Sequence, residues 1–150
     1  MPICCNFACM PRVAEQFRHR IRVRFNECDP QGVVFYANYL MYFDVAMTEL
    51  WREAFGPGYA GMIASGTDAM VAEATIRYRG SARFDDELDL VAGVTRLGTT
   101  STVTRLAAER VTDGVTLAEG ELRHVFIDPA TLAKKPIPDE VRAGMERFAA

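Results

Sequence analysis

Apolar and basic side chains alternate strictly along residues 17 to 25, which is the first clear pattern in the chain. One side carries Phe17, His19, Ile21, Val23 and Phe25, and the other carries Arg18, Arg20, Arg22 and Arg24. Because successive side chains of a β-strand point to opposite faces, this period of two predicts a strand. We interpret the arginines as a solvated or ion-paired face, with contact to an anionic ligand or a partner subunit as the alternative. His19 lies on the apolar side and receives no catalytic role.

A segment without glycine or proline follows from about Phe35 to Phe55 and ends at Gly56-Pro57-Gly58. Its apolar side chains recur at helical spacing: Tyr36, Tyr39, Leu40, Phe43, Met47, Leu50, Trp51 and Ala54. This period predicts one helix of about 30 Å. The apolar face is wider in the first half of the helix, where it also includes Tyr42, Val45 and Ala46. We therefore expect the first half of the helix to be buried on most sides.

The rest of the chain is dominated by alternating segments separated by turn residues. Strands are predicted at 68–78, 88–97, 102–111 and 115–127, and a short helix at 140–149. The loop 79–87 and the turns at 98–101 and 112–114 separate the strands. This order predicts an α+β fold, in which an antiparallel five-stranded sheet wraps around one long central helix. We expect one domain over residues 12–150, preceded by a disordered tail at 1–11.

Composition and charge exclude several classes of function. The chain has 150 residues, 49% of them hydrophobic and 25% charged, which is typical of a globular domain. No apolar run approaches the ~20 residues needed to span a bilayer, so no membrane partner is expected. The net charge of −3 argues against a nucleic-acid partner but still allows a small phosphorylated ligand.

Four cysteines, at positions 4, 5, 9 and 28, bear on redox and metal chemistry. Three of them crowd the first nine residues, which does not resemble a disulfide framework or a zinc site. We expect no metal and no cofactor. The N-terminus lacks the pattern of a signal peptide, so a cytoplasmic location is expected. Met10 is a candidate for an alternative translation start, which N-terminal sequencing of the native protein would test.

The most informative segment joins the first strand to the long helix. Asp29-Pro30-Gln31-Gly32 has the residues of a type I turn, and turn formation alone could explain Asp29. However, "FNECDPQGVVFYANYLMYFD" at 25–44 and "RYRGSARFDDELDL" at 77–90 resemble hotdog-fold acyl-CoA thioesterases of the 4-hydroxybenzoyl-CoA thioesterase type. The resemblance covers about residues 17–138, and the predicted order of elements is also the hotdog order.

The resemblance implies a hydrolytic site at the start of the helix. Asp29 would be the catalytic carboxylate, as nucleophile or as general base. The backbone N–H of Tyr36, in the first turn of the helix, would polarise the thioester carbonyl. Physical chemistry supports both roles, because free N–H groups at a helix start stabilise an oxyanion and the helix dipole favours an ionised carboxylate. Many relatives in the wider acyl-CoA thioesterase group carry histidine where this chain has Tyr36. The chain therefore resembles the aromatic-acyl subgroup more than it resembles the wider group.

Two groups of residues are candidates for binding the substrate. The acyl group would contact Gly32, Val33, Val34, Asn38 and Tyr39. Glycine lets a ligand approach the backbone, whereas the asparagine and the tyrosine could equally have structural roles. The CoA phosphates would contact Arg83, Arg96, Thr99, Thr100 and Ser101, although these residues also fit ordinary hairpins.

Other reactive side chains receive structural interpretations. Cys28 has no candidate base in the motif and is interpreted as a small buried residue. Glu73 is a rival carboxylate but fits a salt bridge on a strand face better. The remaining candidates are interpreted as solvated or structural charges: Glu27, Asp44, Glu49, Glu53 and His124.

The resemblance also implies a homo-oligomer, either a dimer or a dimer of dimers, with acyl-CoA as substrate. Hydroxybenzoyl-CoA is one candidate, while related enzymes accept aliphatic acyl-CoA or acyl carrier protein. The competing class is a non-catalytic hotdog module that binds acyl-CoA or acyl carrier protein. A hydratase is disfavoured because its histidine-containing motif is missing here.

Overall fold

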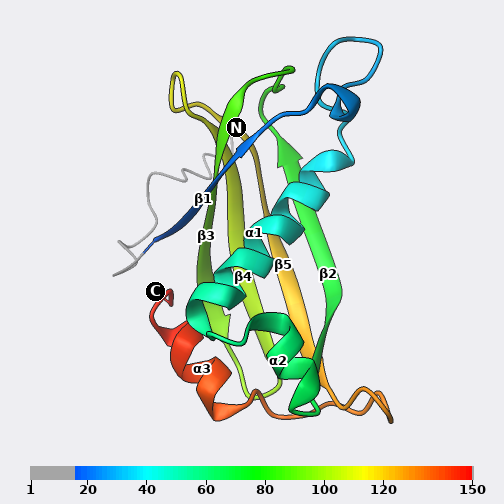
Figure 1. The fold of residues 1–150 in the computed structure, drawn as a ribbon, viewed down its shortest axis with the longest axis vertical. Helices are drawn as coiled ribbons and strands as arrows, with labels where there is room; N and C mark the ends of the chain where they lie inside the picture. The colour runs from blue at the N-terminus through cyan, green and yellow to red at the C-terminus, as the bar shows by residue number, and fades with distance from the viewer. Residues whose placement is uncertain (1–15, 150) are drawn as a thin grey trace, which may run out of the picture.

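The computed structural model describes residues 16–149, in which a five-stranded sheet carries one long helix across its face (Figure 1). The strands are β1 (Phe17–Arg22), β2 (Asp68–Tyr78), β3 (Glu87–Leu97), β4 (Ser101–Arg110) and β5 (Thr116–Ile127). The helices are α1 (Asn38–Ala54), α2 (Gly58–Ala64) and α3 (Asp139–Glu146). The predicted N-terminal tail, with three of the cysteines and Met10, lies outside the described residues. No helix within 16–149 is long and apolar enough to cross a bilayer.

Short connections determine the sheet topology. The strand order is β1-β3-β4-β5-β2, and every neighbouring pair is antiparallel. Strands β3, β4 and β5 follow one another through tight turns, whereas β1 and β2 add to the two edges. The predicted α+β fold with a five-stranded antiparallel sheet and a long central helix is therefore confirmed.

Differences from the predicted elements occur at their ends. The first strand ends at Arg22, and a short 3₁₀ turn, Phe25–Glu27, replaces its last residues. Helix α1 begins at Asn38 rather than Phe35. Helix α2 was not predicted, because Gly56-Pro57-Gly58 was interpreted only as a helix stop. Pro57 in fact occupies the N-cap of α2, and proline is compatible with the start of a helix as well as with its end.

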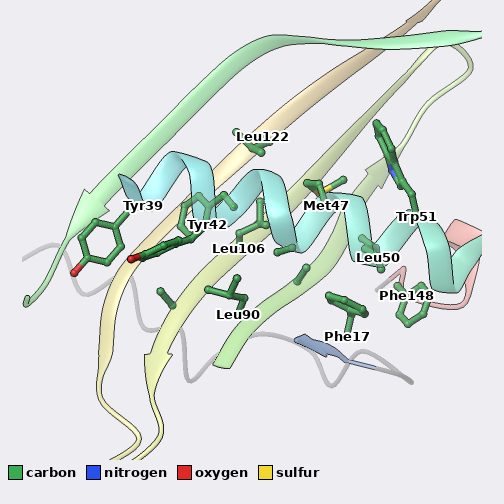
Figure 2. Packing of buried hydrophobic residues seen from close by; sticks show 14 of the residues in the cluster. Phe17, Tyr39, Tyr42, Met47, Leu50, Trp51, Leu90, Leu106, Leu122 and Phe148 are labelled. Atoms are coloured by element: carbon green, nitrogen blue, oxygen red, sulfur yellow. The ribbon is translucent and has the colours of Figure 1, made fainter. Parts of the chain in front are cut away.

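The core lies between α1 and the sheet (Figure 2). Helix α1 buries Tyr39, Tyr42, Phe43, Ala46, Met47, Leu50 and Trp51. Leu90, Leu106 and Leu122 face them from the three central strands. The prediction that the first half of α1 is buried on most sides is wrong for a single chain, because Leu40, Met41 and Val45 are exposed. One sheet covers only one side of the helix.

The opposite face of the sheet carries cross-strand ion pairs. Arg18 contacts Glu109, Arg20 makes a two-point contact with Asp89, and Arg22 contacts Glu87, with shortest N–O distances of 2.8–2.9 Å. Glu73 likewise pairs with Arg123 at 3.0 Å. The ion-paired interpretations of the first-strand arginines and of Glu73 are therefore confirmed. Pairs as exposed as these each contribute little to stability.

Strand β2 is an edge strand whose other edge has no partner among the described residues. Most of its residues are exposed, including Met70 and Val71. Its position against β5 depends on Gly120, because a β-carbon there would lie 2.0 Å from the backbone oxygen of Thr75. The missing side chain permits this close approach, and the ladder with β5 holds β2 in the sheet. The end of β2 reaches the start of α1, where the Tyr78 hydroxyl donates to the Tyr36 carbonyl.

His124 differs from its predicted surroundings. Its side chain is buried beneath α1, and its ring centroid lies 5.1 Å from that of Trp51. Burial lowers the pKa of His124 to about 4, since transfer of an imidazolium out of water is unfavourable. The solvated interpretation of this residue is therefore wrong, and the structural one is correct.

The buried His124 predicts a specific pH dependence of stability. An unfolded chain protonates histidine near pH 6.5, whereas the folded protein keeps His124 neutral down to about pH 4. The unfolded state thus binds more protons in this window, and stability falls as the pH falls through it. We expect His124→Phe to remove up to about 3 kcal/mol of this acid sensitivity, measured by urea unfolding between pH 7 and pH 4. Parallel pH curves for the two proteins would contradict the assignment.

Candidate active site

The loop before α1 is organised by the turn that contains Asp29. Gly32 N–H donates to the Asp29 carbonyl at 2.9 Å, which closes the predicted turn. Asp29 Oδ1 accepts the Gln31 N–H at 2.8 Å, whereas Oδ2 accepts no hydrogen bond from residues 16–149. Gly32 has a φ of +75°, a left-handed conformation that glycine adopts without steric cost. The turn therefore holds one carboxylate oxygen and leaves the other available.

Backbone hydrogen bonds anchor this turn to the loop before β3. Asp29 N–H donates to Val33 at 2.9 Å, and Val34 N–H donates to Ala82 at 2.8 Å. Ala82 N–H in turn donates to the hydroxyl of Tyr39 on α1 at 2.9 Å. Val34 and Tyr39 are both buried, so within one chain they support the loop from behind. Val33 is half-buried and Gly32 is exposed.

Two backbone donors remain free where the chain enters α1. Phe35 N–H donates to Glu27, and Asn38 N–H donates back to Phe35, both at 2.9 Å. The N–H groups of Tyr36 and Ala37 find no acceptor within the part of the chain that the structure describes. Tyr36 lies two residues before the first residue of α1, so its predicted place in the first helical turn is corrected to the turn that precedes the helix.

Glu27 accepts hydrogen bonds from residues on either side of these two donors. Its backbone oxygen accepts the Asn38 side-chain amide at 2.8 Å, so Asn38 has a structural hydrogen bond. Its carboxylate accepts the N–H of Arg24 at 2.7 Å, the guanidinium of Arg24 and the hydroxyl of Tyr42. Burial acts to raise the pKa of Glu27, but these hydrogen bonds outweigh it and hold the pKa below its usual value. The structural interpretation of Glu27 is confirmed, although the sequence did not show this network.

Two pairs of exposed aromatic side chains include residues of the segment between β1 and α1. Tyr36 is 63% exposed, and its ring lies edge-on to that of Tyr78 at 6.3 Å. The Tyr78 hydroxyl also donates to the Tyr36 carbonyl at 3.0 Å. A second exposed pair, Phe25 and Phe84, has ring centroids 5.8 Å apart. Sequence reasoning missed Tyr78, because only the fold brings the end of β2 to the start of α1.

Arg83 adds a cation beside the turn. Its Nη1 lies 3.8 Å from the position that a β-carbon would take at Gly32. The Arg83 guanidinium is exposed and makes no ion pair with residues 16–149. The structure thus brings Arg83 to the loop that carries Asp29.

The other proposed CoA contacts lie elsewhere. Arg96 and the turn at 98–101 are at the far end of β3, about 33 Å from its beginning at Glu87 (Figure 1). The turn is held there by Ile137 N–H, which donates to Thr99, and by Arg142, which donates to the Gly98 carbonyl. Within one chain, Thr99, Thr100 and Ser101 are therefore not brought together with Asp29.

The local geometry also bears on metal binding and on Cys28 as a thiol nucleophile. Among residues 16–149, no group of three or more His, Cys, Asp or Glu side chains is placed to hold a metal ion. Cys28 is partly buried and packs against the core. The segment that carries Asp29 also carries the free N–H groups of Tyr36 and Ala37.

Comparisons with known proteins agree with one another. A family model described as "Thioesterase-like superfamily" matches residues 23–145. The acyl-CoA thioester hydrolase YbgC of Escherichia coli is 29% identical over 129 residues, which cover 85% of this chain and 93% of that protein. A thioesterase-superfamily structure from Jannaschia sp. CCS1 aligns with a TM-score of 0.85 and 25% identity, over 94% of this chain and 98% of that one. The BH1999 gentisyl-coenzyme A thioesterase aligns with a TM-score of 0.76 and 26% identity, over 84% and 99%.

The bond from Ala82 to Tyr39 predicts a measurable loss of stability. Tyr39→Phe leaves the Ala82 N–H without its acceptor beside buried side chains, which costs about 1–3 kcal/mol. Tyr59→Phe is the matched control, because it removes a hydroxyl that bonds Asp68 at the surface, and it should cost below about 0.5 kcal/mol. Urea unfolding measures both, and equal losses would contradict the anchoring role of Tyr39.

Proposed function

The chain belongs to the thioesterase-like superfamily, and from that premise we propose that it is an enzyme that hydrolyses acyl-CoA to a carboxylic acid and CoA. One observation carries the proposal: a single loop presents both the Asp29 carboxylate and the unpaired N–H groups of Tyr36 and Ala37. Hydrolysis of a thioester needs both an attacking group and a donor for the oxyanion.

The backbone N–H of Tyr36 serves as the oxyanion donor. As the carbonyl carbon becomes tetrahedral, negative charge develops on its oxygen, and a fixed donor there stabilises the transition state more than the ground state. The dipole of α1, which begins at Asn38, adds to this stabilisation. Loss of one such donor typically costs about 10²–10³ in rate.

Asp29 provides the attack through its free Oδ2. As a general base, it takes a proton from water, the hydroxide adds to the carbonyl carbon, and the carbon–sulfur bond breaks to release the CoA thiolate, which is then protonated. As a nucleophile, it adds directly and releases the thiolate, and water then hydrolyses the mixed anhydride. Both routes yield the same products, and the hydrogen bond from Gln31 orients the carboxylate in either case.

The exposed aromatic pairs favour an aromatic acyl group as substrate. Tyr36, Tyr78, Phe25 and Phe84 offer exposed rings for edge-on or stacked contacts. A similar protein described as a gentisyl-coenzyme A thioesterase supports an aromatic substrate such as hydroxybenzoyl-CoA. The exposed Gly32 and half-buried Val33 would contact the acyl group directly, with Val34, Asn38 and Tyr39 supporting them.

The CoA end of the substrate needs cations, and a second subunit would add them. Arg83 is placed to contact a phosphate beside the Asp29 loop. One edge of β2 has no partner among residues 16–149, and α1 exposes Leu40, Met41 and Val45. Both features suit pairing with another copy in a dimer or tetramer. Antiparallel pairing of two β2 strands would bring the second copy's Arg96 and 98–101 turn to the same end as Asp29.

Thiol release from a panel of acyl-CoA esters tests the proposed activity. We expect turnover of benzoyl- and hydroxybenzoyl-CoA above that of acetyl-, hexanoyl- and palmitoyl-CoA. Asp29→Asn should lower kcat by about 10²–10⁴-fold, whereas Asp44→Asn on the exposed side of α1 should leave it unchanged. If the wild type binds these esters without turnover, the protein is a non-catalytic binding module. If Asp29→Asn keeps full activity, another carboxylate is the catalytic one.

A thioester substrate without phosphates tests whether Arg83 or Arg96 binds the phosphates of CoA. Arg83→Ala should raise KM for benzoyl-CoA roughly tenfold or more, in line with the loss of one charge-assisted contact. KM for the benzoyl thioester of N-acetylcysteamine, which lacks phosphates, should not change. Arg96→Ala tests the 98–101 turn in the same assay, and an effect there alone would show that the nucleotide contacts that turn rather than Arg83.

A further inference from the structure

Glu27 accepts hydrogen bonds from residues on both sides of Tyr36. Its backbone oxygen accepts the Phe35 N–H at 2.9 Å and the Asn38 side-chain amide at 2.8 Å. Phe35 comes immediately before Tyr36, and Asn38 comes two residues after it. The chain around the proposed oxyanion donor is therefore tied at two points to one residue.

The direction of the Tyr36 N–H follows from the peptide plane that contains it. That plane also holds the Phe35 carbonyl, which accepts the Asn38 N–H at 2.9 Å. In a trans peptide the N–H and the C=O point in opposite directions. Since the carbonyl is directed toward α1, the Tyr36 N–H is directed away from the helix, where no acceptor from residues 16–149 reaches it.

The Glu27 carboxylate keeps this arrangement in place. Oε2 accepts the Arg24 N–H at 2.7 Å and the Tyr42 hydroxyl at 2.9 Å, and Oε1 accepts two bonds from the Arg24 guanidinium. Tyr42 lies one helical turn after Asn38, so α1 contacts residue 27 through both side chains. Hydrogen bonds to a charged group are stronger than neutral ones.

We propose that Glu27 is a positioning residue that fixes the direction of the Tyr36 N–H. The inference rests on the proposed thioesterase function, since it concerns the donor of that site. Glu27 does not touch the substrate. It acts through the backbone, where a displacement of about 1 Å can cost 10² in rate.

Glu27→Gln and Tyr42→Phe test the proposal, with Glu119→Gln as the matched control. Glu119 is a second carboxylate paired with an arginine, Arg79, and the side chains of Glu27 and Glu119 are both 11% exposed. We expect Glu27→Gln to lower kcat about 10–100-fold with KM within threefold, and Tyr42→Phe to act in the same direction but less. Tyr42→Phe removes only a hydroxyl, so it keeps the test informative if Glu27→Gln does not fold. Glu119→Gln should match the wild type.

A spectroscopic readout separates positioning from general stability. The probe is the ketone analogue of benzoyl-CoA in which a methylene replaces the sulfur, with ¹³C at the carbonyl. Bound to the wild type, its infrared carbonyl stretch should fall below that in water because Tyr36 N–H polarises it. In Glu27→Gln the stretch should return toward the value in water, and in Glu119→Gln it should not.

Two results would overturn the inference and can be told apart. If the wild type lowers the stretch and both Glu27→Gln and Tyr42→Phe lower it equally, Glu27 does not position the donor, although the proposed function stands. If the wild type binds the ketone without lowering the stretch, the donor itself fails, and with it the proposed role of Tyr36.

Discussion

The burial of one face of α1 against the sheet is the constraint on which the site depends. Phe43, Met47 and Leu50 fix the helix in place, and its first residue then has a defined position relative to the end of β1. The loop between them must connect two fixed ends, and Glu27 and Ala82 supply the acceptors that hold it. Backbone groups that the loop leaves unpaired are thereby directed outward, where a ligand can use them.

Much of the fold could be predicted from the sequence because its periods are clear. Alternation along 68–78 and helical spacing along 36–54 each admit one interpretation, and tight turns between strands require antiparallel neighbours. Element ends were less predictable. Phe35 and Tyr36 fit a helix by spacing, yet a hydrogen bond from Phe35 to Glu27 keeps them in a turn. Helix α2 was missed because Pro57 marks a helix start as readily as a helix stop.

Only those parts of the candidate site that lie close together in the sequence could be predicted. The Asp29 turn follows from the types and spacing of four residues, whereas the left-handed φ of Gly32 was not predicted. The contacts of Glu27 with Tyr42 and of Tyr78 with Tyr36 join residues that are distant in sequence, so only the fold reveals them. The same is true of the separation between Arg83 and Arg96: both belong to the segment around β3, but the length of that strand places them at opposite ends.

In the proposed mechanism, one loop holds an attacking carboxylate and an oxyanion donor around a thioester carbonyl. A crystal structure of Asp29→Asn with benzoyl-CoA bound tests it most directly. We expect the carbonyl oxygen at hydrogen-bond distance from the Tyr36 nitrogen, about 3 Å, with the substituted side chain at position 29 facing the carbonyl carbon. A carbonyl oxygen bonded to another donor, or a thioester bound away from this loop, would contradict it.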